Sequence, residues 1–130
     1  GDDTVMIGMG AFAHENVRTL VEFGCRKVWN VARHFNLLMP RVICWWVNQS
    51  TTPLHAAAVL HGMEPMYKIC GFDPWKFFSV TANADRTVAT IKQYTRWGIS
   101  DIFFLSLYFN KAEIIKGEVK RFKPYSAVLS

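Results

Sequence analysis

The ten residues Thr4–Ala13, TVMIGMGAFA, join a short apolar run to two glycines and predict the start of a βαβ unit. Thr4–Ile7 has the length and apolar, partly β-branched character of a buried parallel strand, and the glycine segment Gly8–Ala13 follows directly. Gly24 then stands where a helix commonly ends. The residues that recur at helical spacing before it are Ala13, Val17, Leu20, Val21 and Phe23. Lys27–Ala32 predicts a second strand, reached by a right-handed crossover.

The spacing Gly8-x-Gly10-x-x-Ala13, between a predicted strand and a predicted helix, is typical of a dinucleotide-binding turn. Gly8 permits the tight turn, Gly10 lets a pyrophosphate approach the backbone, and Ala13 keeps the helix close to the strand. The helix N-terminus offers N–H donors and a favourable dipole to the anion. His14 lies beside this turn, in the first helical turn, and is expected to be partly exposed; the alternative is that it contacts the ligand. The predicted cofactor-binding residues of this turn are Gly8, Met9, Gly10, Ala11, Phe12 and Ala13.

The end of the second predicted strand indicates which dinucleotide would bind. A cofactor without a 2′-phosphate usually meets Asp or Glu about twenty residues after the glycines. This chain instead has Arg33 and His34 there, with no carboxylate between Glu22 and Glu64. A guanidinium suits a phosphate, so these residues favour NADPH over NADH or FAD, with Arg33 on the 2′-phosphate and His34 and Arg18 as further candidates. The alternative is that the glycines only turn the chain and that Arg33 points to water.

Residues 36–98 predict a series of short helices that begin beside prolines. The four predicted starts are Pro40, Thr52-Pro53, Glu64-Pro65 and Asp73-Pro74, and the second and third helices are expected to end at Gly62 and at Cys70-Gly71. Residues 81–86 predict a loop, and residues 87–96 fit helix and strand equally. Four short helices in a row do not belong inside a doubly wound unit, so we expect residues 36–98 to be an insertion.

Residues 99–130 predict a return to the α/β unit. Ser100-Asp101 is expected to cap an aromatic helix over Ile102–Phe109. Three short β-rich runs follow, Glu113–Ile115, Glu118–Phe122 and Ser126–Leu129, and the last two predict a half-exposed antiparallel hairpin. The predicted fold is α/β: a partial Rossmann-like βαβ dinucleotide-binding unit (1–35), a helical insertion (36–98), and a return to the nucleotide domain that ends in a β-hairpin (99–130).

The composition of the 130 residues is that of one soluble globular domain. Apolar residues make up 51%, aromatic residues 15% and charged residues only 19%, which excludes a disordered tail or a coiled coil. No apolar run approaches the ~20 residues of a membrane span. Residues 66–130 carry ten of the fifteen basic residues, but singly rather than clustered, so no nucleic-acid partner is predicted. The aromatic excess predicts either an aromatic core or a surface that packs against something outside the chain.

The thiols and imidazoles offer no catalytic or metal-binding pattern. The three cysteines form no CxxC pair and predict buried, reduced thiols in an intracellular, cytoplasmic protein; they are Cys25, Cys44 and Cys70. His55 and His61 lie six residues apart, off a common helical face, so no metal site is predicted. No catalytic residue is identified.

The stretch Val5–Arg18, VMIGMGAFAHENVR, resembles the second dinucleotide fingerprint of flavin-dependent monooxygenases, the family that includes flavin-containing and Baeyer–Villiger monooxygenases. In that family this fingerprint binds NADPH, and a basic residue that ends the second strand contacts the 2′-phosphate, a role that maps onto Arg33. Baeyer–Villiger members then carry a helical insertion, similar in placement to residues 36–98. The stretch from Ser100 to Val119 resembles the return to the nucleotide domain.

The resemblance implies an FAD- and NADPH-dependent oxidoreductase in which NADPH reduces FAD and the reduced flavin traps oxygen. Such an enzyme needs an FAD domain with its own glycine fingerprint, and this chain carries one fingerprint only. We therefore expect an NAD(P)H-binding segment of a longer protein, without catalysis of its own, whose partners are an FAD domain or neighbouring subunits. The alternative is a non-catalytic structural or interaction protein that retains the fold and packs its tryptophan-rich insertion against partners.

Overall fold

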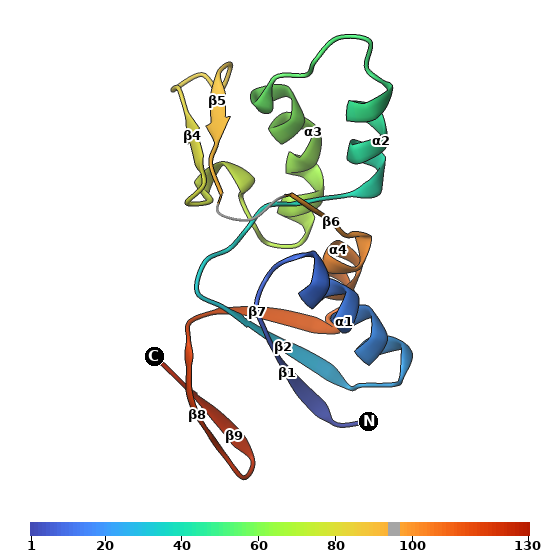
Figure 1. Cartoon of the computed structure of the whole chain (residues 1–130), viewed down its shortest axis with the longest axis vertical. Helices are drawn as coiled ribbons and strands as arrows, with labels where there is room; N and C mark the ends of the chain where they lie inside the picture. The colour runs from blue at the N-terminus through green and yellow to red at the C-terminus, as the bar shows by residue number, and fades with distance from the viewer. Residues whose placement is uncertain (94–96) are drawn as a thin grey trace.

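The structure is a computed structural model that describes residues 1–93 and 97–130. Over these residues it is a mixed α/β structure with small sheets and four α-helices (Figure 1). In chain order its elements are β1 (Asp3–Ile7), α1 (Ala11–Glu22), β2 (Lys27–Ala32), β3 (Leu38–Met39), α2 (Arg41–Gln49), α3 (Ala56–Ile69), the 3₁₀ turn η1 (Pro74–Lys76), β4 (Val80–Ala82), β5 (Ala89–Ile91), β6 (Gly98–Ile99), α4 (Asp101–Tyr108), β7 (Ala112–Lys116), β8 (Val119–Lys123) and β9 (Ser126–Leu129). Residues 94–96, the end of the segment that fitted helix and strand equally, lie outside the described residues.

A parallel sheet with the order β1-β2-β7 lies in the lower half of Figure 1, below α2, α3 and the strands β4 and β5. Helix α1 joins β1 to β2 and packs on one face of the sheet, where Val17, Val28 and Ala112 are buried together. The two predicted strands, the helix between them and its end at Gly24 are confirmed, and the φ of Gly24 is +83°. Phe23 does not join the apolar face: it is the C-cap residue, where the chain leaves helical geometry, and it is 87% exposed.

Strands β3 and β6 pair in parallel, so the two ends of the segment 36–98 lie side by side. Between them, the predicted helix after Pro40 is confirmed as α2. The predicted start at Asp73 is also confirmed, because its carboxylate accepts a hydrogen bond from the Trp75 N–H at 3.1 Å, although η1 is a single turn. The division of the chain into three segments stays a prediction.

The antiparallel hairpin β4–β5 was not predicted, and residues 81–82 lie in a strand rather than in a loop. Three-residue strands leave too little periodicity to identify from sequence. The hairpin depends on the Asn83 side chain, whose Oδ1 accepts hydrogen bonds from the N–H groups of Thr87 and Val88 at 3.0 Å each.

Helix α3 corrects the prediction of two helices separated near residue 62. The chain continues as one helix through Gly62 and Pro65. Gly62 is a packing contact rather than a stop, because a Cβ built on it would lie 3.0 Å from the Trp46 ring and 3.4 Å from Ile43 of α2. The helix continues past Pro65 because side chains on both sides of it, such as Met63 and Tyr67, are fully buried.

Pro65→Ala is expected to raise the free energy of unfolding by about 2 kcal/mol. Pro65 is exposed and lies inside α3, so alanine restores a backbone N–H and removes the clash with the preceding turn, a gain of about 3 kcal/mol. The greater freedom of alanine in the unfolded chain offsets about 1 kcal/mol of this gain. Chemical denaturation measures the change, and Pro53→Ala, an exposed proline outside the helix, is the matched control. A lower stability of Pro65→Ala would contradict this account.

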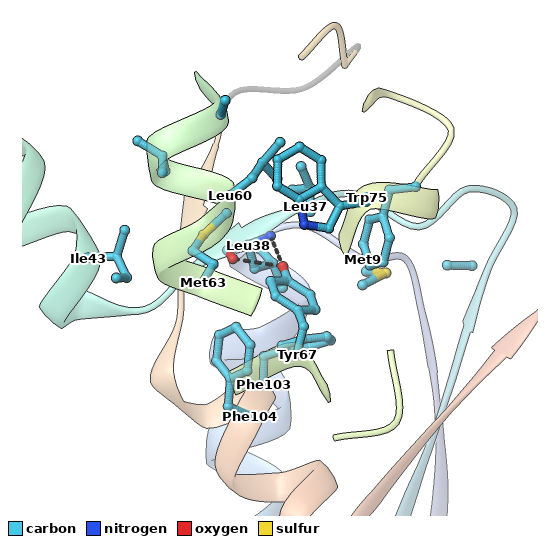
Figure 2. Close-up of a cluster of buried hydrophobic side chains, with 14 residues drawn as sticks. Met9, Leu37, Leu38, Ile43, Leu60, Met63, Tyr67, Trp75, Phe103 and Phe104 are labelled. Atoms are coloured by element: carbon cyan, nitrogen blue, oxygen red, sulfur yellow. Dashed lines mark hydrogen bonds between the residues drawn. The ribbon is translucent and has the colours of Figure 1, made fainter. Parts of the chain in front are cut away.

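The main core is built around α3 and combines aromatic with aliphatic side chains (Figure 2). Tyr67 is fully buried, and its ring packs edge-on against Phe77 and Phe104. Its hydroxyl donates a hydrogen bond to the Leu38 carbonyl at 2.8 Å and accepts one from the Leu38 N–H at 2.7 Å, drawn as dashed lines in Figure 2. Burial raises the pKa of the Tyr67 hydroxyl, which therefore stays protonated. Other aromatic side chains remain at the surface, with Trp45 63% exposed.

The helix and the three strands predicted between Ser100 and Leu129 are confirmed, whereas the return to a nucleotide domain stays a prediction. Ser100 caps α4 by accepting a hydrogen bond from the Phe103 N–H at 3.3 Å. Strand β7 adds to the parallel sheet, and β8 and β9 form the antiparallel hairpin at the lower left of Figure 1. Among the described residues, no helix is both long enough and apolar enough to cross a membrane.

Candidate functional site

A cleft of about 750 Å³ lies at the carboxyl ends of β1 and β2. Its lining includes Gly8 and Met9 after β1, Arg33, His34 and Asn36 after β2, and Glu118 after β7. Ligands of parallel α/β sheets bind outside the carboxyl ends of the strands, and the volume lies within the ~300–1,000 Å³ of common ligand pockets. The parallel pairing of β1 with β2 therefore brings the two predicted parts of the site, the glycine turn and the basic strand end, to one cleft.

The glycine turn has the backbone that its sequence predicts. Gly8 has a φ of +111°, a left-handed conformation that other residues rarely adopt, and its N–H donates a hydrogen bond to the Val31 carbonyl at 2.8 Å. A Cβ built on Gly8 would lie 3.9 Å from the Ala13 Cβ, an ordinary van der Waals distance, so the requirement for glycine comes from φ and not from crowding by the helix. Gly10 is the N-cap of α1, and a Cβ built there would meet no atom within 4 Å. The backbone at Gly10 is thus open to an approaching ligand.

Two asparagines hold this turn, and the sequence reasoning missed both. Asn30, buried at 1% exposure in β2, donates hydrogen bonds from Nδ2 to the carbonyls of Met6 at 3.2 Å and Gly8 at 2.6 Å. Asn36 donates from Nδ2 to the Met9 carbonyl at 3.3 Å. A polar residue inside the apolar run Lys27–Ala32 could have identified Asn30, because buried polar groups are retained where they find partners. No local signal marks Asn36.

The N-terminus of α1 lies beside the cleft rather than in its lining. Its first turn has no side-chain cap and no acidic residue, so its N–H groups are available to an anion. Of the eight predicted cofactor-binding residues, four line the cleft and four do not: Gly10, Ala11, Phe12 and Ala13. Gly98 of β6 packs on one side of this turn, since a Cβ built on it would lie 3.2 Å from the Ala11 nitrogen.

Arg33, at the basic end of β2, lies near the carboxylate of Glu118, which was not predicted to be part of the site. Arg33, with a 72% exposed side chain, has its Nη1 3.9 Å from Oε1 of Glu118. The His34 ring packs against Phe78 with the ring centroids 5.0 Å apart. Glu118 could not be found by local spacing, because it reaches the cleft only through the pairing of β7 with β2.

Two residues near the turn, Arg18 and His14, lie outside the lining of the cleft. Arg18 pairs with Glu15, with Nε 3.4 Å from Oε2, and does not line the cleft. His14 is buried at 2% exposure instead of partly exposed, because its position on α1 faces Phe103 of α4 at a centroid distance of 5.1 Å. Neither of its ring nitrogens has a hydrogen-bond partner among the described residues, and burial lowers the pKa of this imidazole to about 4. His14 is therefore neutral at pH 7.

The described residues contain no group of three or more His, Cys, Asp or Glu side chains that could hold a metal ion. The three cysteines are free thiols but half-buried rather than buried. Cys25 lies between α1 and β2, Cys70 is the C-cap residue of α3, and burial raises the pKa of the Cys70 thiol.

The comparisons with known proteins give no match: no protein-family model, no curated protein and no solved structure matches the chain. The class that the geometry defines is a mixed α/β structure with a ligand-sized cleft at the carboxyl ends of a parallel sheet. The residues that line this cleft are therefore the basis for a proposed function.

Proposed function

We propose that this cleft binds NADPH and that the chain is the NAD(P)H-binding segment of a flavin-dependent, monooxygenase-like oxidoreductase. The observation that supports the proposal is that the glycine turn, represented by Gly8 and Met9, and the basic pair Arg33 and His34 line one cleft. Strands β1, β2 and β7 form a parallel sheet with α1 between the first two, and in the Rossmann-like sheet that we propose a dinucleotide would lie across the strand ends.

The residues present fit the parts of a dinucleotide. The pyrophosphate would extend from the cleft to the neighbouring Gly10, where no atom fills the space of a Cβ, within reach of the uncapped N–H groups of α1. Arg33 would bind the 2′-phosphate through its guanidinium, and its partner Glu118 is distant and exposed enough to be displaced. Asn30 would keep the Gly8 carbonyl turned away from the anion by its 2.6 Å hydrogen bond. When bound, the nicotinamide supplies a hydride to a flavin held outside this chain.

Arg33→Ala is expected to weaken NADPH binding at least tenfold and to leave NADH binding nearly unchanged. The guanidinium would contact only the 2′-phosphate, which NADH lacks, and one charge-assisted contact of this kind corresponds to about 1.5–3 kcal/mol. Isothermal titration calorimetry of the whole chain with each nucleotide measures both affinities. Arg26→Ala is the matched control, because Arg26 pairs with Asp3 at the opposite end of the same sheet.

Gly8→Val is expected to abolish binding of both nucleotides, since valine does not adopt the φ of +111° that shapes the turn. Circular dichroism should show that each variant is folded before binding is measured. A folded wild-type chain that binds neither nucleotide would overturn the proposed function. A preference for NADH over NADPH would overturn the role of Arg33.

A further inference from the structure

Glu118 is held beside Arg33 by backbone hydrogen bonds on both sides of it. The Gly117 N–H donates to the Ala32 carbonyl at 3.0 Å, next to Arg33 in the chain. The Glu118 carbonyl accepts hydrogen bonds from Ser130, from its N–H at 3.0 Å and from its hydroxyl at 3.4 Å. The backbone of Glu118 is therefore fixed at the edge of the cleft, and its exposed side chain brings the carboxylate to 3.9 Å from the Arg33 guanidinium.

The pair of charges gives this part of the cleft two opposite tendencies. Arg33 attracts a phosphate, whereas Glu118, with Oε1 3.9 Å from Nη1 of Arg33, repels one and partly neutralises the guanidinium. A phosphate monoester carries about −1.5 to −2 charges at pH 7, so the repulsion is large for a 2′-phosphate. A free ribose hydroxyl instead donates a hydrogen bond to a carboxylate, as acidic residues at strand ends do in dinucleotide sites.

We infer that Glu118 is a specificity-determining residue of this cleft, which limits the preference for 2′-phosphorylated dinucleotides by repelling the phosphate and accepting a hydrogen bond from an unmodified ribose. The inference rests on the proposed function, because it assumes that the ribose lies between Arg33 and Glu118. The wild-type cleft then prefers NADPH over NADH less strongly than a cleft that contained Arg33 without Glu118 would.

Glu118→Gln tests this role, because it removes the charge and keeps the shape. The variant is expected to bind NADPH about tenfold more tightly and NADH no more tightly than the wild type does, so that the ratio of the two affinities rises. The gain should shrink at 0.5 M salt, since both charges are exposed. The matched control is Glu113→Gln, whose exposed carboxylate pairs with Lys27 at 2.9 Å and does not line the cleft; both affinities should stay as in the wild type.

The outcomes separate this inference from the proposed function. An unchanged affinity ratio in Glu118→Gln, while Arg33→Ala weakens NADPH binding, overturns the inference and leaves the proposed function standing. Binding of NADPH by Glu118→Gln but not by the wild type supports the inference and overturns the function of the natural chain. Absence of binding by both folded proteins overturns both.

Discussion

Tyr67→Phe is expected to lower the free energy of unfolding by about 2–4 kcal/mol. The ring stays in the core, but the change removes the hydroxyl that bonds both the N–H and the carbonyl of Leu38. Both residues are almost completely buried, so water does not replace the lost partner, and an unpaired buried polar group costs about 1–3 kcal/mol. Urea denaturation followed by tryptophan fluorescence measures the difference.

The control for this prediction is Tyr125→Phe, because Tyr125 is fully exposed and its stability change should stay within about 0.5 kcal/mol. Amide exchange adds a local measurement: the Leu38 N–H should exchange faster in Tyr67→Phe, whereas amides of β2 are less affected. Equal stability of the two tyrosine variants would mean that the Tyr67 hydroxyl does not anchor β3.

The second large effect is a loss of about 3 kcal/mol of stability through His14 as the pH falls from 6.5 to 4. Burial lowers the pKa of the folded imidazole from 6.5 to about 4, so between these values the unfolded chain binds a proton that the folded chain excludes. The full stability is therefore present above pH 6.5, and it decreases as the pH falls toward 4. Each pKa unit corresponds to about 1.4 kcal/mol.

His14→Leu isolates this contribution, because leucine fills the space of the imidazole and has no group that binds a proton. The variant should lose less stability than the wild type between pH 6.5 and 4, and it should be at least as stable at pH 7, since two unpartnered ring nitrogens are removed. His55→Leu, at an exposed position, is the control for the exchange of a histidine for leucine itself. Carboxylates with lowered pKa values, such as Asp3 and Glu64, act equally in all three proteins and cancel in the comparison. Identical pH profiles of the wild type and His14→Leu would contradict the burial of an unpartnered imidazole.

Much of the fold could be predicted because its signals are local. The strand of Thr4–Ile7, the helix that ends before Gly24, and the cap at Ser100 depend on residues within a few positions of one another. Local rules were wrong for α3, where Gly62 predicted the end of one helix and Glu64-Pro65 the start of another. Packing overrode them: Gly62 lies against the Trp46 ring, and buried side chains hold both halves of the helix.

The site divides in the same way. Gly8, Met9, Arg33 and His34 could be predicted together because each follows a predicted strand, and parallel strands end at the same edge of a sheet. The burial of His14 could not, because it depends on α4, which begins far along the chain.

The sequence alone thus predicted the two short segments that line the cleft, since the glycine turn and the basic strand end are each a run of consecutive residues. The carboxylate opposite Arg33 depended on long-range pairing: β7 must add to β2, and the Gly117 N–H must reach the Ala32 carbonyl, before Glu118 enters the cleft. No spacing rule spans the segment 36–98 that separates them. The charge of the cleft, and with it the expected choice of nucleotide, is therefore a property of the folded chain.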